Sequence, residues 1–95
     1  MSTLRLTGVL KVIGETKTYG ENGFIKRDFV LLTEGEYPQT IAMEMTQTHC
    51  DKLDYFTEGQ TVEVEFSVKG KEYVNKENET KYFNSLNAYK IASID

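Results

Sequence analysis

Residues 59–91, which read GQTVEVEFSVKGKEYVNKENETKYFNSLNAYKI, decide the fold. The first half of this stretch alternates strictly between apolar and polar side chains. The apolar set is Val62, Val64, Phe66 and Val68, and the polar set between them is Glu63, Glu65, Ser67 and Lys69. Alternation of this kind predicts a strand with one face buried and the other in water.

A polar tract at residues 75–80 interrupts the pattern, with aromatic residues on both sides of it. Such a tract predicts that the chain reverses there and returns as a second strand, which makes a long hairpin with a charged tip. The water-facing side of the hairpin is expected to carry Lys69, Lys71 and Tyr73, and the run continues across the tip with Lys76, Lys81 and Tyr82. Cations for phosphates and flat rings for bases are what a groove for single-stranded nucleic acid needs.

Two further strands are expected upstream. Residues 4–13 place Leu4, Leu6, Leu10 and Val12 at even spacing, interrupted by Gly8, which predicts a long first strand with a bulge or bend. A tight turn at Asn22-Gly23 leads into a second strand at residues 24–32. Lys26 and Arg27 point to opposite faces of that strand, so only one of them can line a groove shared with the hairpin, and parity does not say which.

A third strand and a helix complete the list of elements. Gly35 and Pro38 mark a turn, after which residues 40–46 place Ile41, Met43 and Met45 inward and Glu44 outward. Thr48 and Asp51 have the spacing of a helix capping box, Leu53 and Phe56 share one helical face, and Gly59 ends the helix. The order strand, strand, strand, helix, strand, strand is that of the OB-fold, a five-stranded barrel with a helix between strands 3 and 4. OB-folds take up oligonucleotides or oligosaccharides on the face of strands 2 and 3 and on the neighbouring loops.

Length and composition favour one domain spanning residues 1–95. The chain has no signal-peptide pattern, no apolar run of about 20 residues and one cysteine, Cys50, so a cytoplasmic location is expected. The net charge of −4 is unusual for a protein that binds phosphates. However, acids such as Glu34 and Asp54 lie mid-chain and lysines gather on the hairpin, which is compatible with a positive groove on a negative body.

The hairpin resembles the last hairpin of bacterial single-stranded DNA-binding proteins. The resemblance rests on residues 59–66, on the lysine-rich stretch 68–73 that ends in Tyr73, and on Lys81-Tyr82-Phe83. Residues 26–31, 37–39 and 82–86 are similar to a family of small uncharacterised OB-fold domains of Bacteroidetes and their phages. The resemblance implies base stacking on Tyr73, in place of the more usual tryptophan, with Lys69, Lys71 and Lys81 on phosphates. It also implies a dimer or tetramer formed by strand pairing. The sequence departs from the bacterial pattern in showing no acidic tail, so recruitment of partners through such a tail is not expected.

We therefore expect a sequence-tolerant binder of single-stranded DNA, or of RNA, which stacking platforms also accept. The candidate nucleic-acid-binding residues are Lys17, Tyr19, Phe24, Lys26, Arg27, Lys69, Lys71, Tyr73, Lys76, Lys81 and Tyr82. Phe29, Phe66 and Phe83 are expected in the core. Two other readings stay open: a protein-interaction module or accessory subunit, which the acidic net charge favours, and a saccharide-binding domain, which fold analogy alone supports.

Catalysis is not expected from this sequence. His49 is the only histidine, and the chain contains no phosphate-binding glycine loop and no nucleophile elbow. His49 beside Cys50 cannot complete a tetrahedral metal site because no second cysteine or histidine is present. No catalytic residue, metal site or cofactor is therefore predicted, and His49 and Cys50 are interpreted as ordinary surface and core residues.

Overall fold

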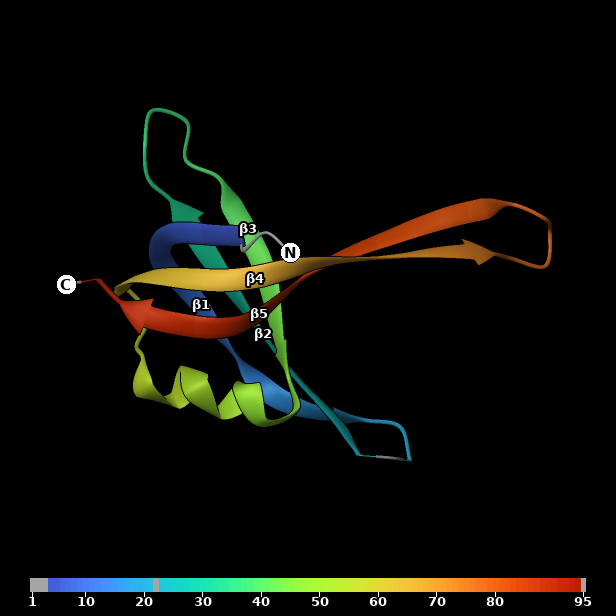
Figure 1. Cartoon of the computed structure of the whole chain (residues 1–95), viewed down its shortest axis with the longest axis horizontal. Helices are drawn as coiled ribbons and strands as arrows, with labels where there is room; N and C mark the ends of the chain where they lie inside the picture. The colour runs from blue at the N-terminus through green and yellow to red at the C-terminus, as the bar shows by residue number, and fades with distance from the viewer. Residues whose placement is uncertain (1–3, 22, 95) are drawn as a thin grey trace.

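The computed structural model describes residues 4–21 and 23–94 and contains the predicted elements in the predicted order (Figure 1). The strands are β1 (Leu4–Tyr19), β2 (Phe24–Thr33), β3 (Thr40–Thr46), β4 (Thr61–Val74) and β5 (Thr80–Ser93), and a 3₁₀ helix, η1 (Gln47–Tyr55), follows β3. The strands close into a barrel in the order β1-β2-β3-β5-β4, with β3 and β5 parallel and the other neighbours antiparallel. The predicted OB-fold is confirmed.

Strand β1 is long because it serves two neighbours. Its first part pairs with β4 and its later part with β2, and Gly8 pairs with both Val62 and Thr33. A Cβ atom on Gly8 would lie 2.7 Å from the carbonyl oxygen of Leu32, so only glycine lets the two backbones approach this closely. The predicted bend in the first strand therefore has a steric cause.

A register shift in β1 separates Val12 from the face of Leu10. Leu10 is fully buried, but the shift after it lets Val12 pair with Val30, and Val12 is 45% exposed. Ile13 packs against the core instead. Even spacing alone would place Val12 on the same face as Leu10, but one extra residue reverses the alternation.

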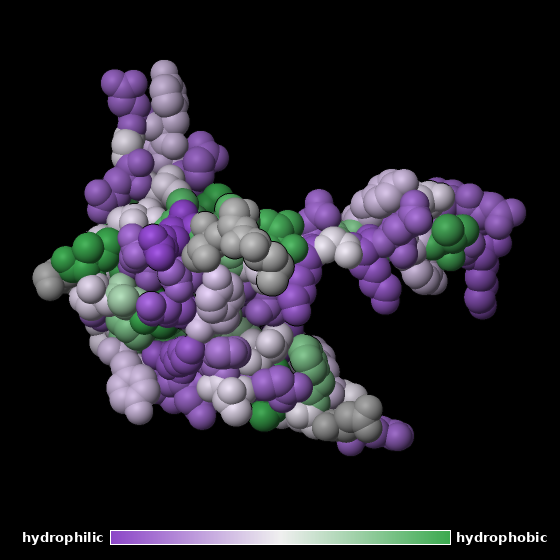
Figure 2. Space-filling view, in the orientation of Figure 1, coloured by the Kyte–Doolittle hydropathy of each residue, from purple (hydrophilic) through white to green (hydrophobic). Residues whose placement is uncertain are grey.

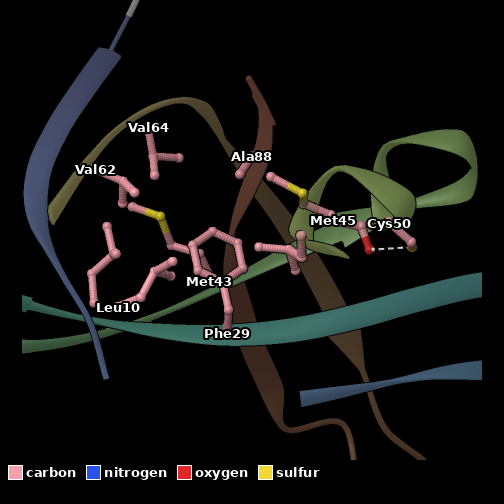
Figure 3. Packing of buried hydrophobic residues seen from close by; sticks show 10 residues of the cluster. Leu10, Phe29, Met43, Met45, Cys50, Val62, Val64 and Ala88 are labelled. Carbon is pink, nitrogen blue, oxygen red and sulfur yellow. Dashed lines mark hydrogen bonds between the residues drawn. The ribbon is translucent and has the colours of Figure 1, made fainter. Parts of the chain in front are cut away.

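The core combines inward side chains of all five strands with two residues of η1 (Figure 3). Its members are Leu10, Phe29, Leu31, Met43, Met45, Cys50, Leu53, Val62, Val64 and Ala88. The predicted inward positions of Phe29, Met43 and Met45 are confirmed, and Phe66 packs against the cluster as expected. The thiol of Cys50 donates to the carbonyl oxygen of Met45 at 3.2 Å, and burial raises its pKa, so Cys50 is a core residue as predicted.

The predicted helix exists, but it begins differently. Thr48 lies inside η1, and the residue that precedes the helix, Thr46, makes no capping hydrogen bond with its side chain. The predicted capping box is therefore wrong. The helix is held instead by the buried side chain of Leu53 and by Lys52, whose Nζ donates to the carbonyl oxygen of Tyr89 at 2.6 Å. Among the described residues, none of the helical segments has the length and apolar character needed to cross a bilayer.

Strands β4 and β5 run well beyond the barrel as a two-stranded ribbon, residues 68–86, which we call the arm (Figure 1). The arm contributes to the long dimension of a molecule that measures 49 × 34 × 26 Å. At its tip the Oδ1 of Asn75 accepts hydrogen bonds from the backbone N–H groups of Glu77 and Glu79, both at 2.9 Å. The predicted chain reversal over the polar tract is confirmed.

Candidate nucleic-acid interface

One face of the arm carries rings and ammonium groups in alternating positions. The cross-strand pairs on this face are Lys69 with Ser85, Lys71 with Phe83, and Tyr73 with Lys81. Residues that pair directly across two strands share a face, so these side chains stand together. We call this side the basic face. Tyr73 is 50% exposed and Phe83 is 58% exposed, so both rings are accessible to a ligand.

The spacing of the basic face suits an extended chain of nucleotides. Successive pairs on one face of a ribbon lie about 7 Å apart, since a strand rises about 3.4 Å per residue. Tyr73 and Phe83 are diagonal neighbours, and so are Lys71 and Lys81. Diagonal neighbours lie about 7 to 8 Å apart. A strand laid along the arm therefore meets a cation at each step and a ring at two of them.

The opposite face of the arm has a different character. Its pairs are Val68 with Leu86, Gly70 with Asn84, Glu72 with Tyr82, and Val74 with Thr80. The predicted stacking residue Tyr82 therefore points away from Tyr73. Phe83, which was expected in the core, lies exposed on the basic face, and that expectation was wrong because the alternation continues after the strand has left the barrel.

The lysines of the arm are not engaged by acids. The ion pairs among residues 4–21 and 23–94 join Arg5 and Lys90 to Glu65, Lys26 to Glu44, and Arg27 to Asp54. None of these pairs includes Lys69, Lys71, Lys76 or Lys81. Lys76 lies at the tip, where it lines a shallow depression together with Tyr73 and Lys81; Glu77 and Glu79 also line this depression but form no ion pair with these lysines among the described residues. The ammonium groups of the arm are therefore available to an anionic ligand.

A second cluster lies at the end of the β1–β2 hairpin, which we call the β1–β2 tip. Tyr19 pairs with Phe24, and Lys17 pairs with Lys26, so these four predicted residues share one face. The two rings are 46% and 41% exposed. The turn between them includes Gly23, which adopts a left-handed φ of 69°, whereas Asn22 lies outside the described residues. All four residues were predicted from the sequence, and the register of β1 and β2 brings them together.

The structure separates Lys26 from Arg27. The guanidinium of Arg27 donates to the carbonyl oxygens of Gly14 (2.8 Å) and Cys50 (3.2 Å) and to the carboxylate of Asp54 (2.7 Å). Its Nε and Nη1 join β1 to η1, and its side chain is only 14% exposed, so little of the guanidinium is accessible to a ligand. Lys26 points outward, as the strand alternation requires, and it alone of the two shares the face of the β1–β2 tip.

The two clusters lie on one continuous outer face of the sheet. A row of paired residues crosses four strands from Asp28 to Glu44, then to Asn87 and Ser67. A depression lies between the clusters. Its acidic lining residues are Asp28 and Glu44, and the rest of its lining is Phe29, Val30, Ala42, Met43, Asn84, Ser85 and Leu86. Ser85 also lines the neighbouring depression beside Lys69, Lys71 and Phe83. Acidic side chains therefore occupy the middle of a face whose two ends are basic and aromatic.

Glu44 also forms an ion pair with Lys26, one of the basic residues of the β1–β2 tip. The Nζ of Lys26 lies 2.8 Å from Oε2 of Glu44, and both side chains are largely covered, at 33% and 19% exposure. This hydrogen bond is the main reason why the pKa of Lys26 is raised. The ammonium group of Lys26 is therefore charged but already paired, unlike those of the arm.

A comparison with solved structures agrees with the fold. The chain is similar to the mitochondrial single-stranded DNA-binding protein Rim1 of S. cerevisiae, with a TM-score of 0.65 and 15% sequence identity. The similarity covers 98% of this chain and 94% of that protein. At this identity the likeness establishes a shared fold.

Sequence comparisons give a family. No curated protein matches the chain at the level of sequence. The family model described as "Domain of unknown function (DUF3127)" matches residues 5–92, which is nearly the whole chain. The chain therefore belongs to the DUF3127 family, and its fold is that of the single-stranded DNA-binding proteins.

Proposed function

We propose that this protein binds single-stranded DNA, without strong sequence preference, in replication, recombination or repair. The observation that carries the proposal is the basic face of the arm, where three unpaired lysines alternate with the exposed rings of Tyr73 and Phe83. Ring stacking and cation contacts to the backbone are the two interactions by which proteins hold single strands of any sequence. The shared fold with a yeast mitochondrial protein that binds single-stranded DNA supports the same class of ligand.

We assign a role to each kind of side chain. Bases stack on Tyr73 and Phe83, and Lys69, Lys71 and Lys81 contact the phosphates on either side of them. The β1–β2 tip offers Tyr19 and Phe24 as a further stacking site. Arg27 is left out of this interface because its Nε and Nη1 are bonded inside the protein and its side chain is only 14% exposed.

The proposal is tested by titrating a fluorescently labelled poly-dT oligonucleotide at several salt concentrations. We expect binding at low salt, with a plot of log affinity against log salt of slope about −2, since three cations each displace about 0.7 counterion from a single strand. A sizing experiment on the same sample tests the dimer or tetramer that the family resemblance implies. Absence of binding at low salt would overturn the proposal.

One observation favours a second function, that of a protein-interaction module. The opposite face of the arm exposes Val68, Val74 and Tyr82 at 55%, 56% and 70%, and apolar side chains exposed together often mark a protein contact. If oligonucleotides fail to bind at low salt, this face becomes the leading candidate for the functional surface.

A further inference from the structure

The outer face of β2 and β3 has the wrong charge for a phosphate backbone. Asp28 and Glu44 pair directly across the two strands, and both line the depression between the arm and the β1–β2 tip. Like charges placed opposite each other destabilise a sheet, and the ion pair of Glu44 with Lys26 offsets only part of this repulsion. Only one cation, Lys26, is bonded to them among the described residues, which leaves the group with a net negative charge.

Basic and aromatic groups lie on both sides of this acidic pair. On one side Lys17 and Lys26 join the rings of Tyr19 and Phe24, and on the other side stands the basic face of the arm. The row of pairs from Asp28 through Glu44 to Asn87 and Ser67 shows that all of these groups share one face of the sheet. In Figure 2 the arm and the β1–β2 tip, which projects at the lower right, diverge from the body with open space between them.

From this arrangement, we infer that Asp28 and Glu44 are specificity-determining residues that divide the DNA-binding face into two separate binding sites, the arm and the β1–β2 tip. This inference rests on the proposed function. The phosphates of a bound strand are held off the centre of the β2–β3 face, so a strand contacts the arm first. It reaches the tip only when it is long enough and flexible enough to cross the acidic pair.

Two consequences for the ligand follow. Short oligonucleotides bind the arm alone. The affinity increases further with oligonucleotide length once a strand is long enough to contact both binding sites, since the second contact is then intramolecular. A duplex is disfavoured because it is stiff over about 150 base pairs and cannot turn its phosphates away from the carboxylates. The acidic pair thus selects a long single strand over a short strand or a duplex.

The experiment measures the affinity of labelled oligo-dT of increasing length for the full chain and for the double variant Asp28→Asn/Glu44→Gln. Both substitutions keep the size of the side chain and remove a repulsion, so the variant is expected to fold. In the variant, oligonucleotides of intermediate length gain roughly threefold to tenfold in affinity at low salt, because two nearby negative charges are gone. The salt slope also steepens by about 0.7 for each phosphate newly contacted.

The matched control changes the total charge equally but elsewhere. Glu36 lies in the β2–β3 loop and Glu63 on the β4 segment that pairs with β1, and both are exposed. The variant Glu36→Gln/Glu63→Gln should leave the length dependence as in the wild type. A single Glu44→Gln variant should gain more than Asp28→Asn, because it also releases the ammonium group of Lys26.

The outcomes separate this inference from the proposed function. If the wild-type chain binds oligo-dT but the double variant shows the same length dependence and salt slope, the role of Asp28 and Glu44 is refuted and the proposed function stands. Equal gains in the double variant and in the control also refute it, since the effect is then one of total charge. If the wild-type chain binds no oligonucleotide, the proposed function and the inference both fall.

Discussion

The barrel and the arm use the same strands in opposite ways. Within the barrel, Val62 and Val64 of β4 are fully buried, whereas every residue from Ser67 to Val74 of the same strand is exposed. A two-stranded ribbon with both faces in water gains little stability from burial. The rings of Tyr73 and Phe83 therefore contribute little to folding, and their exposed position is better explained by contact with a ligand.

The largest effect is expected inside the barrel. Replacing Phe29, which is fully buried, with alanine should lower the free energy of unfolding by about 3 to 5 kcal/mol, since it removes a ring from the core and leaves a cavity. Urea denaturation measures the change. A loss below about 1 kcal/mol would mean that the barrel is not the stabilising part of the molecule.

Arg27→Ala tests which residues belong to the structure and which to the interface. Loss of its contacts to Gly14, Cys50 and Asp54 should reduce the free energy of unfolding by about 2 to 3 kcal/mol, because charge-assisted hydrogen bonds link β1 to η1 there. Lys71→Ala, in the arm, should change it by less than about 0.5 kcal/mol. An Arg27 variant with unchanged stability but weaker oligonucleotide binding would contradict the assignment.

Tyr73→Ala, in the arm, is expected to weaken ligand binding and to leave stability unchanged. Loss of one stacking ring should weaken the binding of poly-dT by about 1 to 3 kcal/mol. The free energy of unfolding, measured by urea denaturation, should stay within about 0.5 kcal/mol of the wild type, because the ring is half exposed and lies outside the barrel. Fluorescence anisotropy gives the affinity, and a variant that unfolds more easily without losing affinity would show that the ring is structural.

Lys71→Ala should produce the smallest effect, on the salt dependence. We expect the slope of log affinity against log salt to become shallower by about 0.7, since one phosphate contact is lost. Lys90→Ala is the matched control, because Lys90 is 66% exposed but lies on the barrel, 3.9 Å from Glu65. Equal changes in both variants would show that the basic face has no special role.

Sequence alone predicted the barrel well because buried strand positions produce a local alternation of apolar and polar residues. The alternation of β3 and β4 identified the inward faces, and Phe29, Met43 and Val64 lie in the core as expected. Alternation does not show where a strand leaves the barrel, which is why Phe83 was misplaced. Nor does it show an extra residue in a strand, which is why the even spacing of Leu10 and Val12 does not put their side chains on one face.

The candidate site was predicted as a set of residues but not as a surface. Lys26 and Arg27 are neighbours in the chain, and only the packing of η1 decides that Arg27 is used internally. Asp28 and Glu44 are far apart in the sequence and meet through strand pairing, so no local pattern indicates the acidic pair. Tyr82 was predicted in the interface because it continues the run of basic and aromatic residues in the sequence. In the structure it pairs with Glu72, on the opposite face of the arm.

The central claim is that one face of the arm, and not the other, holds single-stranded DNA. The adjacent residues Tyr82 and Phe83 give the most direct test, since both rings are exposed, at 70% and 58%, and they lie on opposite faces. In a poly-dT titration at low salt, Phe83→Ala should weaken binding by about 1 to 3 kcal/mol, whereas Tyr82→Ala should change it by less than about 0.5 kcal/mol. Equal losses in the two variants, or a larger loss for Tyr82→Ala, would contradict the account.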